Sequence, residues 1–403
     1  MADNKIELLS PAGDMERLVM ALTYGADAVY LAGRRFGMRA AAGNFGSDEL
    51  GNAVATAHGA GARVYVTCNN VMRNDEMSEL PLFLEELESI GADGIICTDF
   101  GVLSLAKKHA PRVPVHISTQ AGVANYETAA AFFDLGASRV ILARELTLGE
   151  IAEIRAKTPR ELELEAFVHG SMCVSFSGRC LLSNYMTSRD ANRGECAQPC
   201  RWKYHLVEEK RPGEYMELTE DGGTYILNSR DLCMIDHVNE LMEAGISSLK
   251  IEGRMKSAYY AAVVTNAYRR AIDAAIGGEP LKDVWRREVL KVSHREYSTG
   301  FYFDKSGPGE YYRDAMYFSD CDIAAVVESC DADGNAVLTQ RNKFKVGDTL
   351  ELLTPTDEPV GFTAGTLKNS EDEGIDAVPH PMMVFKMKLP AYAPVNSLVR
   401  RLK

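Results

Sequence analysis

The sequence is poor in cysteine and tryptophan and has no long apolar run. It contains 9 cysteines and 2 tryptophans in 403 residues. This low cysteine content is not that of a small secreted scaffold held together by disulfides. No apolar stretch is long enough to cross a bilayer, and the opening residues MADNKIELL do not resemble a secretory leader. These features predict a cytoplasmic protein with reduced thiols and no membrane partner.

Positive charge is also scarce. The chain has 44 lysines and arginines against 57 acidic residues, a net charge of −13. A field of this sign opposes a polyanion, so an RNA partner would have to bind at a local basic patch. The sequence has four candidate patches, although basic groups of this kind are usually ordinary solvated surface. They are Arg34, Arg35 and Arg39; Arg201 and Lys203; Arg286, Arg287 and Arg295; and Arg341, Lys343 and Lys345.

Several catalytic motifs are missing. No GxGxxG motif follows the first predicted strand, which disfavours a dinucleotide-binding domain. Neither HExxH nor GxSxG occurs, and no Ser/His/Asp order can be recognised. The sequence therefore gives little support for a zinc or serine protease.

Residues 1–280 alternate between strand and helix patterns. Five of the predicted strands follow a glycine that fits a helix C-cap, and their β-branched runs suit strands buried on both faces. The strands are predicted at 6–11, 25–31, 61–67, 91–97, 114–119, 136–142, 164–170 and 245–251. The helices are predicted at 14–24, 47–60, 77–90, 101–110, 126–135, 148–157, 233–244 and 256–276. Eight repeats predict an α/β fold, a (β/α)8 TIM-like barrel, with a doubly wound sheet as the alternative.

The rest of the chain has a different pattern. Residues 281–317 are expected to form a connector that includes a short amphipathic helix near 282–292. Residues 318–403 contain short alternating strands separated by turns such as DADGN and KVGD. This pattern predicts a small C-terminal all-β barrel domain.

Four cysteines gather in an insertion of about residues 171–231, after the seventh barrel strand. They are Cys173, Cys180, Cys196 and Cys200. Thiols this close together, without paired histidines, favour zinc or an iron–sulfur cluster over disulfides in a large reduced protein. The alternative is that some of them are small buried apolar residues. Cys233 is a second-choice ligand because it lies further along the chain, at the predicted start of the next helix.

Polar residues follow the barrel strands at their C-terminal ends, where barrel enzymes carry their active sites. The candidates are Arg144, His169, Glu252 and Arg254, together with Glu165 earlier on the seventh strand. Strand alternation predicts that Glu165, Phe167 and His169 share one face. Arginines at such a mouth suit an anion or a small dicarboxylate. Charges inside a barrel, such as Lys250, must otherwise be paired.

Three motifs together carry a family resemblance. They are ExFxHGxMCxxxSGxCxxS at 165–183, NRGxCxxxCRW at 192–202 and LKIEGRMKS at 249–257. With them, the chain resembles the collagenase-like peptidase U-32 family over nearly its whole length. Family members hydroxylate the wobble uridine of tRNA at C5 with prephenate implicated as the hydroxyl source; others act on a cytidine of large-subunit rRNA or on ubiquinone precursors.

The resemblance also implies a cofactor and partners. It implies a 4Fe-4S cluster on Cys173, Cys180, Cys196 and Cys200, with Cys233 as the rival for the fourth position. It further implies a tRNA substrate, a small dicarboxylate donor such as prephenate, and a homo-oligomer or a hetero-oligomer with a paralogue. Hydroxylating a pyrimidine requires a redox-capable cofactor rather than side chains alone.

Two other functions remain open from the sequence. A peptidase, as the family name implies, could pair a cysteine nucleophile with His169, although that cysteine would compete with cluster ligation. A zinc-stabilised binding protein without catalysis is the third possibility.

Overall fold

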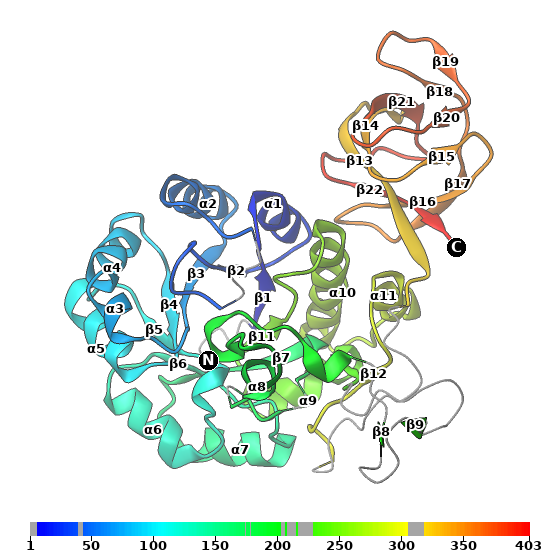
Figure 1. Cartoon of the computed structure of the whole chain (residues 1–403). Coiled ribbons are helices and arrows are strands. Elements are labelled where there is room, and N and C mark those ends of the chain that lie inside the picture. The colour runs from blue at the N-terminus through cyan, green and yellow to red at the C-terminus, as the bar shows by residue number, and fades with distance from the viewer. Residues whose placement is uncertain are drawn as a thin grey trace.

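The computed structural model describes residues 6–38, 43–173, 175–177, 179–202, 206–207, 215–216, 229–304 and 318–403. Within these ranges, no helix is both long and apolar enough to span a bilayer. The chain forms a barrel of parallel strands and a separate all-β domain beside it (Figure 1).

Eight parallel strands close the barrel. They are β1 (Glu7–Pro11), β2 (Ala28–Leu31), β3 (Arg63–Cys68), β4 (Gly94–Cys97), β5 (Val115–Ile117), β6 (Arg139–Ile141), β7 (Glu163–Ser171) and β11 (Ser248–Ile251). Each pairs with its neighbour in sequence, and β11 pairs with both β7 and β1. The predicted (β/α)8 barrel is thereby confirmed, and the doubly wound alternative is wrong.

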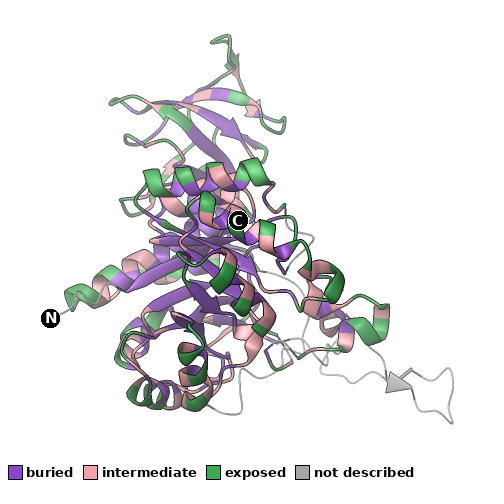
Figure 2. Cartoon of the chain, turned by 90° about the vertical axis from the view of Figure 1, so that its left-hand side faces the viewer, coloured by how far each residue is buried: buried purple, intermediate pink, exposed green. Residues whose placement is uncertain are grey.

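Helices surround this barrel. They are α1 (Met15–Thr23), α2 (Ser47–Gly59), α3 (Asn74–Met77), α4 (Leu80–Ser89), α5 (Phe100–His109), α6 (Tyr126–Asp134), α7 (Leu148–Lys157), α9 (Val238–Glu243) and α10 (Ala258–Gly277). The five glycines that precede strands have φ between +75° and +100°, as expected at helix C-caps. Figure 2 shows the strands buried inside and the exposed residues on the outer faces of the helices.

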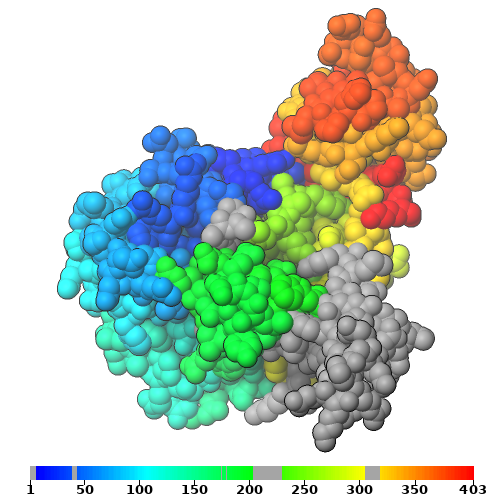
Figure 3. Space-filling view, viewed as in Figure 1, coloured from blue at the N-terminus to red at the C-terminus, as the bar shows by residue number. Residues whose placement is uncertain are grey.

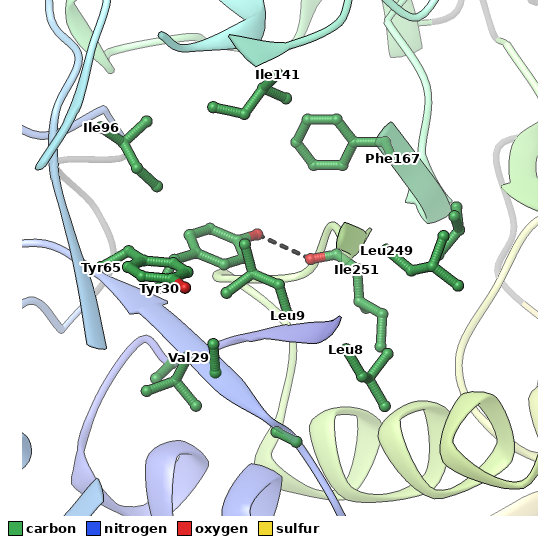
Figure 4. Packing of buried hydrophobic residues seen from close by; sticks show 14 of the residues in the cluster. Leu8, Leu9, Val29, Tyr30, Tyr65, Ile96, Ile141, Phe167, Leu249 and Ile251 are labelled. Atoms are coloured by element: carbon green, nitrogen blue, oxygen red, sulfur yellow. Dashed lines mark hydrogen bonds between the residues drawn. The ribbon is translucent and has the colours of Figure 1, made fainter. Parts of the chain in front are cut away.

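The apolar core fills the space between the strands and the helices, and aromatic side chains enter the barrel itself. Figure 4 shows Tyr30, Tyr65 and Phe167 directed toward the centre of the barrel. The hydroxyl of Tyr30 donates to the backbone carbonyl of Ile251 at 3.0 Å. This bond ties β2 to the end of β11, on the far side of β1.

The chain between β7 and α9 differs from the prediction. Cys233 ends strand β10 (Asp231–Cys233) instead of starting a helix, and α9 begins only at Val238 after the 3-10 turn η4 (Ile235–His237). Strand β10 runs antiparallel to the end of β7, and β12 (Tyr297–Ser298) pairs with β10. The helical pattern of 233–244 could not reveal this pairing, because β10 is only a three-residue strand formed against β7.

The expected connector contains α11 (Asp283–Glu288), the 3-10 turn η5 (Val289–Lys291) and β12; its residues 305–317 lie outside the described ranges. The C-terminal domain has an antiparallel sheet with the strand order β17-β16-β22-β13-β14-β21-β18-β19. These are β13 (Cys321–Cys330), β14 (Asn335–Gln340), β16 (Thr349–Leu353), β17 (Val360–Thr363), β18 (Leu367–Lys368), β19 (Gly374–Ile375), β21 (Val384–Lys388) and β22 (Leu398–Leu402). The predicted all-β C-terminal domain is confirmed.

A buried ion pair joins the two parts. Arg400 on β22 contacts Glu288 of α11 at 2.7 Å, and both side chains are almost completely buried. Tyr24, at the end of α1, donates to the carbonyl of Leu353 at 3.0 Å. The β-domain is therefore attached to the barrel by charged and polar contacts at several points.

Candidate functional site

The cysteine-rich insertion lies over the C-terminal ends of the barrel strands. In Figure 3 the segment around residues 170–200 forms a raised mass at the centre of the face, above the barrel seen in Figure 1. Arg193 of the insertion pairs with Glu76 at 2.7 Å, and the amides of Val71 and Ser177 bond to Asn192 O and to the Glu145 carboxylate. These contacts connect the insertion to the loops that follow β3 and β6.

Short helical segments place the four clustered cysteines. Cys180 lies two residues before α8 (Leu182–Thr187), and Cys200 lies in the 3-10 turn η3 (Pro199–Arg201), which contacts α8. All nine cysteines of the chain are free thiols. Burial raises the pKa of Cys200 to about 11, and the charges of Cys173, Cys196 and Cys180 act in the same direction. The other three thiols therefore lie near enough to act on the pKa of Cys200.

The surroundings of these thiols suit soft-metal ligation. The amide of Gln198 donates to Cys196 Sγ at 3.3 Å, and the positive charge of Arg201 opposes the rise in the pKa of Cys200. Thiolates that bind iron–sulfur clusters are stabilised by such amides and charges. Among the residues that the structure describes, no three His, Cys, Asp or Glu side chains converge on one metal ion.

His169 lies beside this region but faces away from the barrel interior. Its ring is 1% exposed, and its Nε2 and Nδ1 lie 3.2 Å and 3.4 Å from the hydroxyls of Tyr297 and Tyr268. Tyr268 belongs to α10, outside the barrel. Burial lowers the pKa of His169 to about 3. The ring is therefore neutral and held between two tyrosines.

The predicted shared face of Glu165, Phe167 and His169 is wrong at its last member. The pairing of β7 with β11 shifts register between Lys250 and Ile251, so that Val168 has no partner on β11. Such a bulge reverses the alternation of side chains beyond it. Phe167 and Glu165 both contact Lys250 inside the barrel, whereas His169 packs against α10.

Glu165 belongs to a charged network at the opposite end of the barrel, which we call the barrel floor. Arg139 Nη1 lies 2.6 Å from Glu7 and 2.9 Å from Glu165, and Lys250 Nζ lies 2.7 Å from Glu165. Burial acts to raise the pKa of Glu7, but the charge and hydrogen bond of Arg139, together with Arg63 and Tyr65, lower it below its usual value. Every charge of this network is compensated by a neighbour, as burial requires.

The remaining candidates lie at the mouth. Arg144 stacks on the ring of Phe167 at 3.8 Å, donates to the carbonyl of Ser171 at 2.8 Å and lies 3.8 Å from Glu252. Arg254 is 4% exposed, and its Nη1 donates to Thr67 Oγ1 at 3.0 Å. Its Nη2 contacts the carbonyl of Met38. Arg144 and Glu252 are thus near enough to act on one ligand, while Arg254 also holds the loop after β2.

Comparison with known proteins identifies the family. The model of peptidase family U32 matches residues 13–311, and that of the U32 C-terminal domain matches residues 319–400. The chain belongs to peptidase family U32.

Relatives of this U32 protein match it over nearly the full chain. It is 36% identical to tRNA hydroxylation protein P1 of Bacillus subtilis, over 98% of this chain and 95% of the relative. It is 36% identical to tRNA hydroxylation protein P of Escherichia coli, over 93% of this chain and 92% of that one. It is also 40% identical to an uncharacterized protease of Methanocaldococcus jannaschii, over 87% of both chains.

Sequence reasoning missed part of what this U32 barrel contains. Arg139 and Glu7 form the barrel floor, and Tyr268 and Tyr297 hold His169, yet none was singled out. A signal existed for the first two residues, because each is a lone charge within an otherwise apolar, doubly buried strand. Tyr268 had no such signal, since an aromatic residue on a helix is ordinarily part of the core. Tyr297 had none either, because it lies on a two-residue strand that forms only by pairing with β10.

Proposed function

We propose that this U32 protein is an iron–sulfur-dependent enzyme that hydroxylates C5 of the wobble uridine in tRNA. The observation that carries the proposal is the similarity to two proteins named for tRNA hydroxylation, which extends over both domains. The cysteine-rich insertion supports it, because it lies at the end of the barrel where such folds carry their active sites.

In this proposal Cys173, Cys180, Cys196 and Cys200 hold a 4Fe-4S cluster. When bound, the cluster supplies a redox-active centre or a binding point for the hydroxyl donor. Cys200 is favoured over Cys233 for the fourth ligand. Burial raises the pKa of both thiols. The charges of the other three clustered cysteines also raise the pKa of Cys200, whereas the lesser influences on the pKa of Cys233 include Tyr268 and Asp236.

Prephenate, a small dicarboxylate, is the proposed hydroxyl source. Arg144 suits one of its carboxylates because a guanidinium can bind a carboxylate through two parallel hydrogen bonds. The side chain is 14% exposed and is oriented by its stacking on Phe167. It therefore reaches the mouth and would lose little conformational entropy when a ligand binds. Arg254 is proposed to position the loop after β2 and to contribute positive charge. Glu252 would orient Arg144.

A peptidase is the second candidate, because the family and one relative carry that name. The proposed dyad of a cysteine and His169 is poorly supported. A general base works best when its pKa is near the working pH, and the pKa of His169 is about 3. Both ring nitrogens of His169 also lie near tyrosine hydroxyls.

The test is mass spectrometry of tRNA and rRNA nucleosides from a strain that lacks this protein. We expect 5-hydroxyuridine derivatives of tRNA to disappear and to return when the wild-type gene is restored. An unchanged tRNA profile would overturn the proposal, and loss of a modified rRNA cytidine would move the substrate to rRNA. Cleavage of casein or collagen by the purified protein, lost on Cys→Ala substitution, would instead support the peptidase.

A further inference from the structure

The insertion exposes large apolar side chains next to the clustered cysteines. Tyr185 on α8 is 90% exposed and Leu181, just before α8, is 69% exposed. Phe176 and Trp202, at 40% and 41%, are also exposed on this insertion. Burial normally removes such side chains from water, so an exposed group of this kind marks a surface that another molecule covers.

The same segment has a charge opposite to that of the whole chain. Residues 171–202 contain four arginines and two acidic residues, a net charge of +2, whereas the protein carries −13. Arg179 and Arg189 flank α8 in the sequence, and both side chains are exposed. The insertion is thus a local positive surface with an aromatic group at its centre, and this combination suits a nucleic acid.

Several of the other basic groups in the sequence are already engaged. Arg295 is buried against Asp231, and Arg286 pairs with Asp236 and Asp283. Arg341 pairs with Glu16 at 2.7 Å. A paired or buried arginine is less available to bind a phosphate. The C-terminal domain is also acidic overall, with nine basic and thirteen acidic residues between 318 and 403.

Hydrogen bonds hold helix α8, which carries Tyr185, to the rest of the insertion. Ser183 Oγ accepts from the amide of Ala197 at 2.9 Å, and Thr187 Oγ1 donates to the carbonyl of Ser183 at 2.7 Å. Asn192 Nδ2 donates to the carbonyl of Cys180 at 3.1 Å. The backbone that carries Tyr185 is therefore held close to Cys180 and to the turn that contains Cys200.

We propose that Tyr185 is a stacking platform for an unpaired base of the substrate RNA, with Arg179 and Arg189 contacting the adjacent phosphates. This inference rests on the proposed function and adds a contact surface to it. RNA loops are recognised through unstacked bases that lie on aromatic rings, because a base in a duplex hides its face. A base held at Tyr185 would bring its neighbours in the loop to the barrel mouth beside the cysteines.

The test is fluorescence anisotropy with the full-length protein, purified anaerobically to preserve its cofactor. The probe is a fluorescein-labelled RNA stem–loop with uridine at the wobble position, and a fully paired RNA of equal length is the comparison. Stacking on an aromatic residue is worth enough that Tyr185→Ala should raise the Kd for the stem–loop by about fivefold or more. Tyr185→Phe keeps the ring face and should stay within about twofold of the wild type.

A matched control lies on the other domain. Tyr392 is also exposed, at 57%, but belongs to the C-terminal domain, so Tyr392→Ala should leave the Kd unchanged. Arg189→Gln should weaken binding to the stem–loop and the paired RNA alike and reduce the dependence on salt.

Several outcomes would overturn the platform. The first is that Tyr185→Ala binds the stem–loop with the Kd of the wild type. The second is that Tyr392→Ala loses as much affinity as Tyr185→Ala. The third is that Tyr185→Ala loses equal affinity for the stem–loop and for the paired RNA. The fourth is that Tyr185→Ala keeps RNA binding but loses association with a second protein chain, because the surface would then serve a protein. If the wild-type protein binds no RNA while retaining its iron, the proposed function itself fails, and the two failures are distinguished.

Discussion

The two ends of the barrel use charged residues in opposite ways. At the barrel floor, Arg139 is 2% exposed and lies within 2.9 Å of both Glu7 and Glu165, which are themselves buried. At the mouth, Arg144 and Glu252 are 14% and 16% exposed and lie 3.8 Å apart, and the insertion above them exposes arginines and an aromatic ring. The floor is complete without a ligand, whereas the groups at the mouth can still reach one.

This difference separates structural charges from candidate functional ones. A buried charge whose neighbours compensate it contributes to one fixed arrangement, and removing a partner is costly. A partly exposed charge at the C-terminal end of the strands can exchange water for substrate. Perturbed pKa values occur at both ends, so a shifted pKa by itself does not locate the active site.

The largest expected effect comes from the mouth. Cys196→Ser should abolish tRNA hydroxylation in a complemented deletion strain, because an alcohol does not replace a thiolate ligand of iron. Iron and acid-labile sulfide should fall in the purified variant. Cys330→Ser, in the C-terminal domain, is the matched control and should keep full modification. If Cys196→Ser kept the iron content and activity of the wild type, the mouth could not be distinguished from the floor as the functional end of the barrel.

The next largest effect is expected at the barrel floor, where a substitution should lower the free energy of unfolding and not act on the reaction itself. Arg139→Met leaves Glu7 and Glu165 without their shared partner, at a cost of about 3–5 kcal/mol of unfolding free energy. Urea denaturation measures it. Arg112→Met removes an exposed arginine that pairs with Glu88 and should leave the unfolding midpoint unchanged. Equal stability of the Arg139→Met and wild-type proteins would contradict the structural role of the floor.

The smallest effect is a pH dependence at His169. Its pKa is about 3 in the folded protein and about 6.5 in an unfolded chain, so the unfolded chain takes up the proton first as the pH falls. The contribution of His169 to the free energy of unfolding is fully present above about pH 6.5. Below that pH the free energy of unfolding falls by about 1.4 kcal/mol per pH unit. His169→Gln should flatten the dependence of unfolding free energy on pH in urea titrations. The same slope in variant and wild type would show that His169 is already charged when folded.

Much of the fold follows from local patterns, and the site follows less completely. Glycine-led strands such as 136–142 and 245–251 predict the barrel because each needs only its own residues to be recognised. The orientation of His169 could not be predicted, because it depends on a bulge where β7 meets β11, more than eighty residues later in the chain. The seating of the insertion likewise depends on Glu76 and Glu145, from two other loops.

Strand β10 has one more consequence. Because Asp231 and Cys233 pair with Ser171 and His169, the cysteine-rich segment leaves the barrel and returns to it at a single place. A segment whose two ends are already held together can lengthen or shorten at little entropic cost and without pulling on either strand. The length of this segment can therefore change without disturbing the barrel. Substitutions or length changes in this one segment can therefore alter the surface above the barrel, while the eight-stranded frame beneath keeps its geometry.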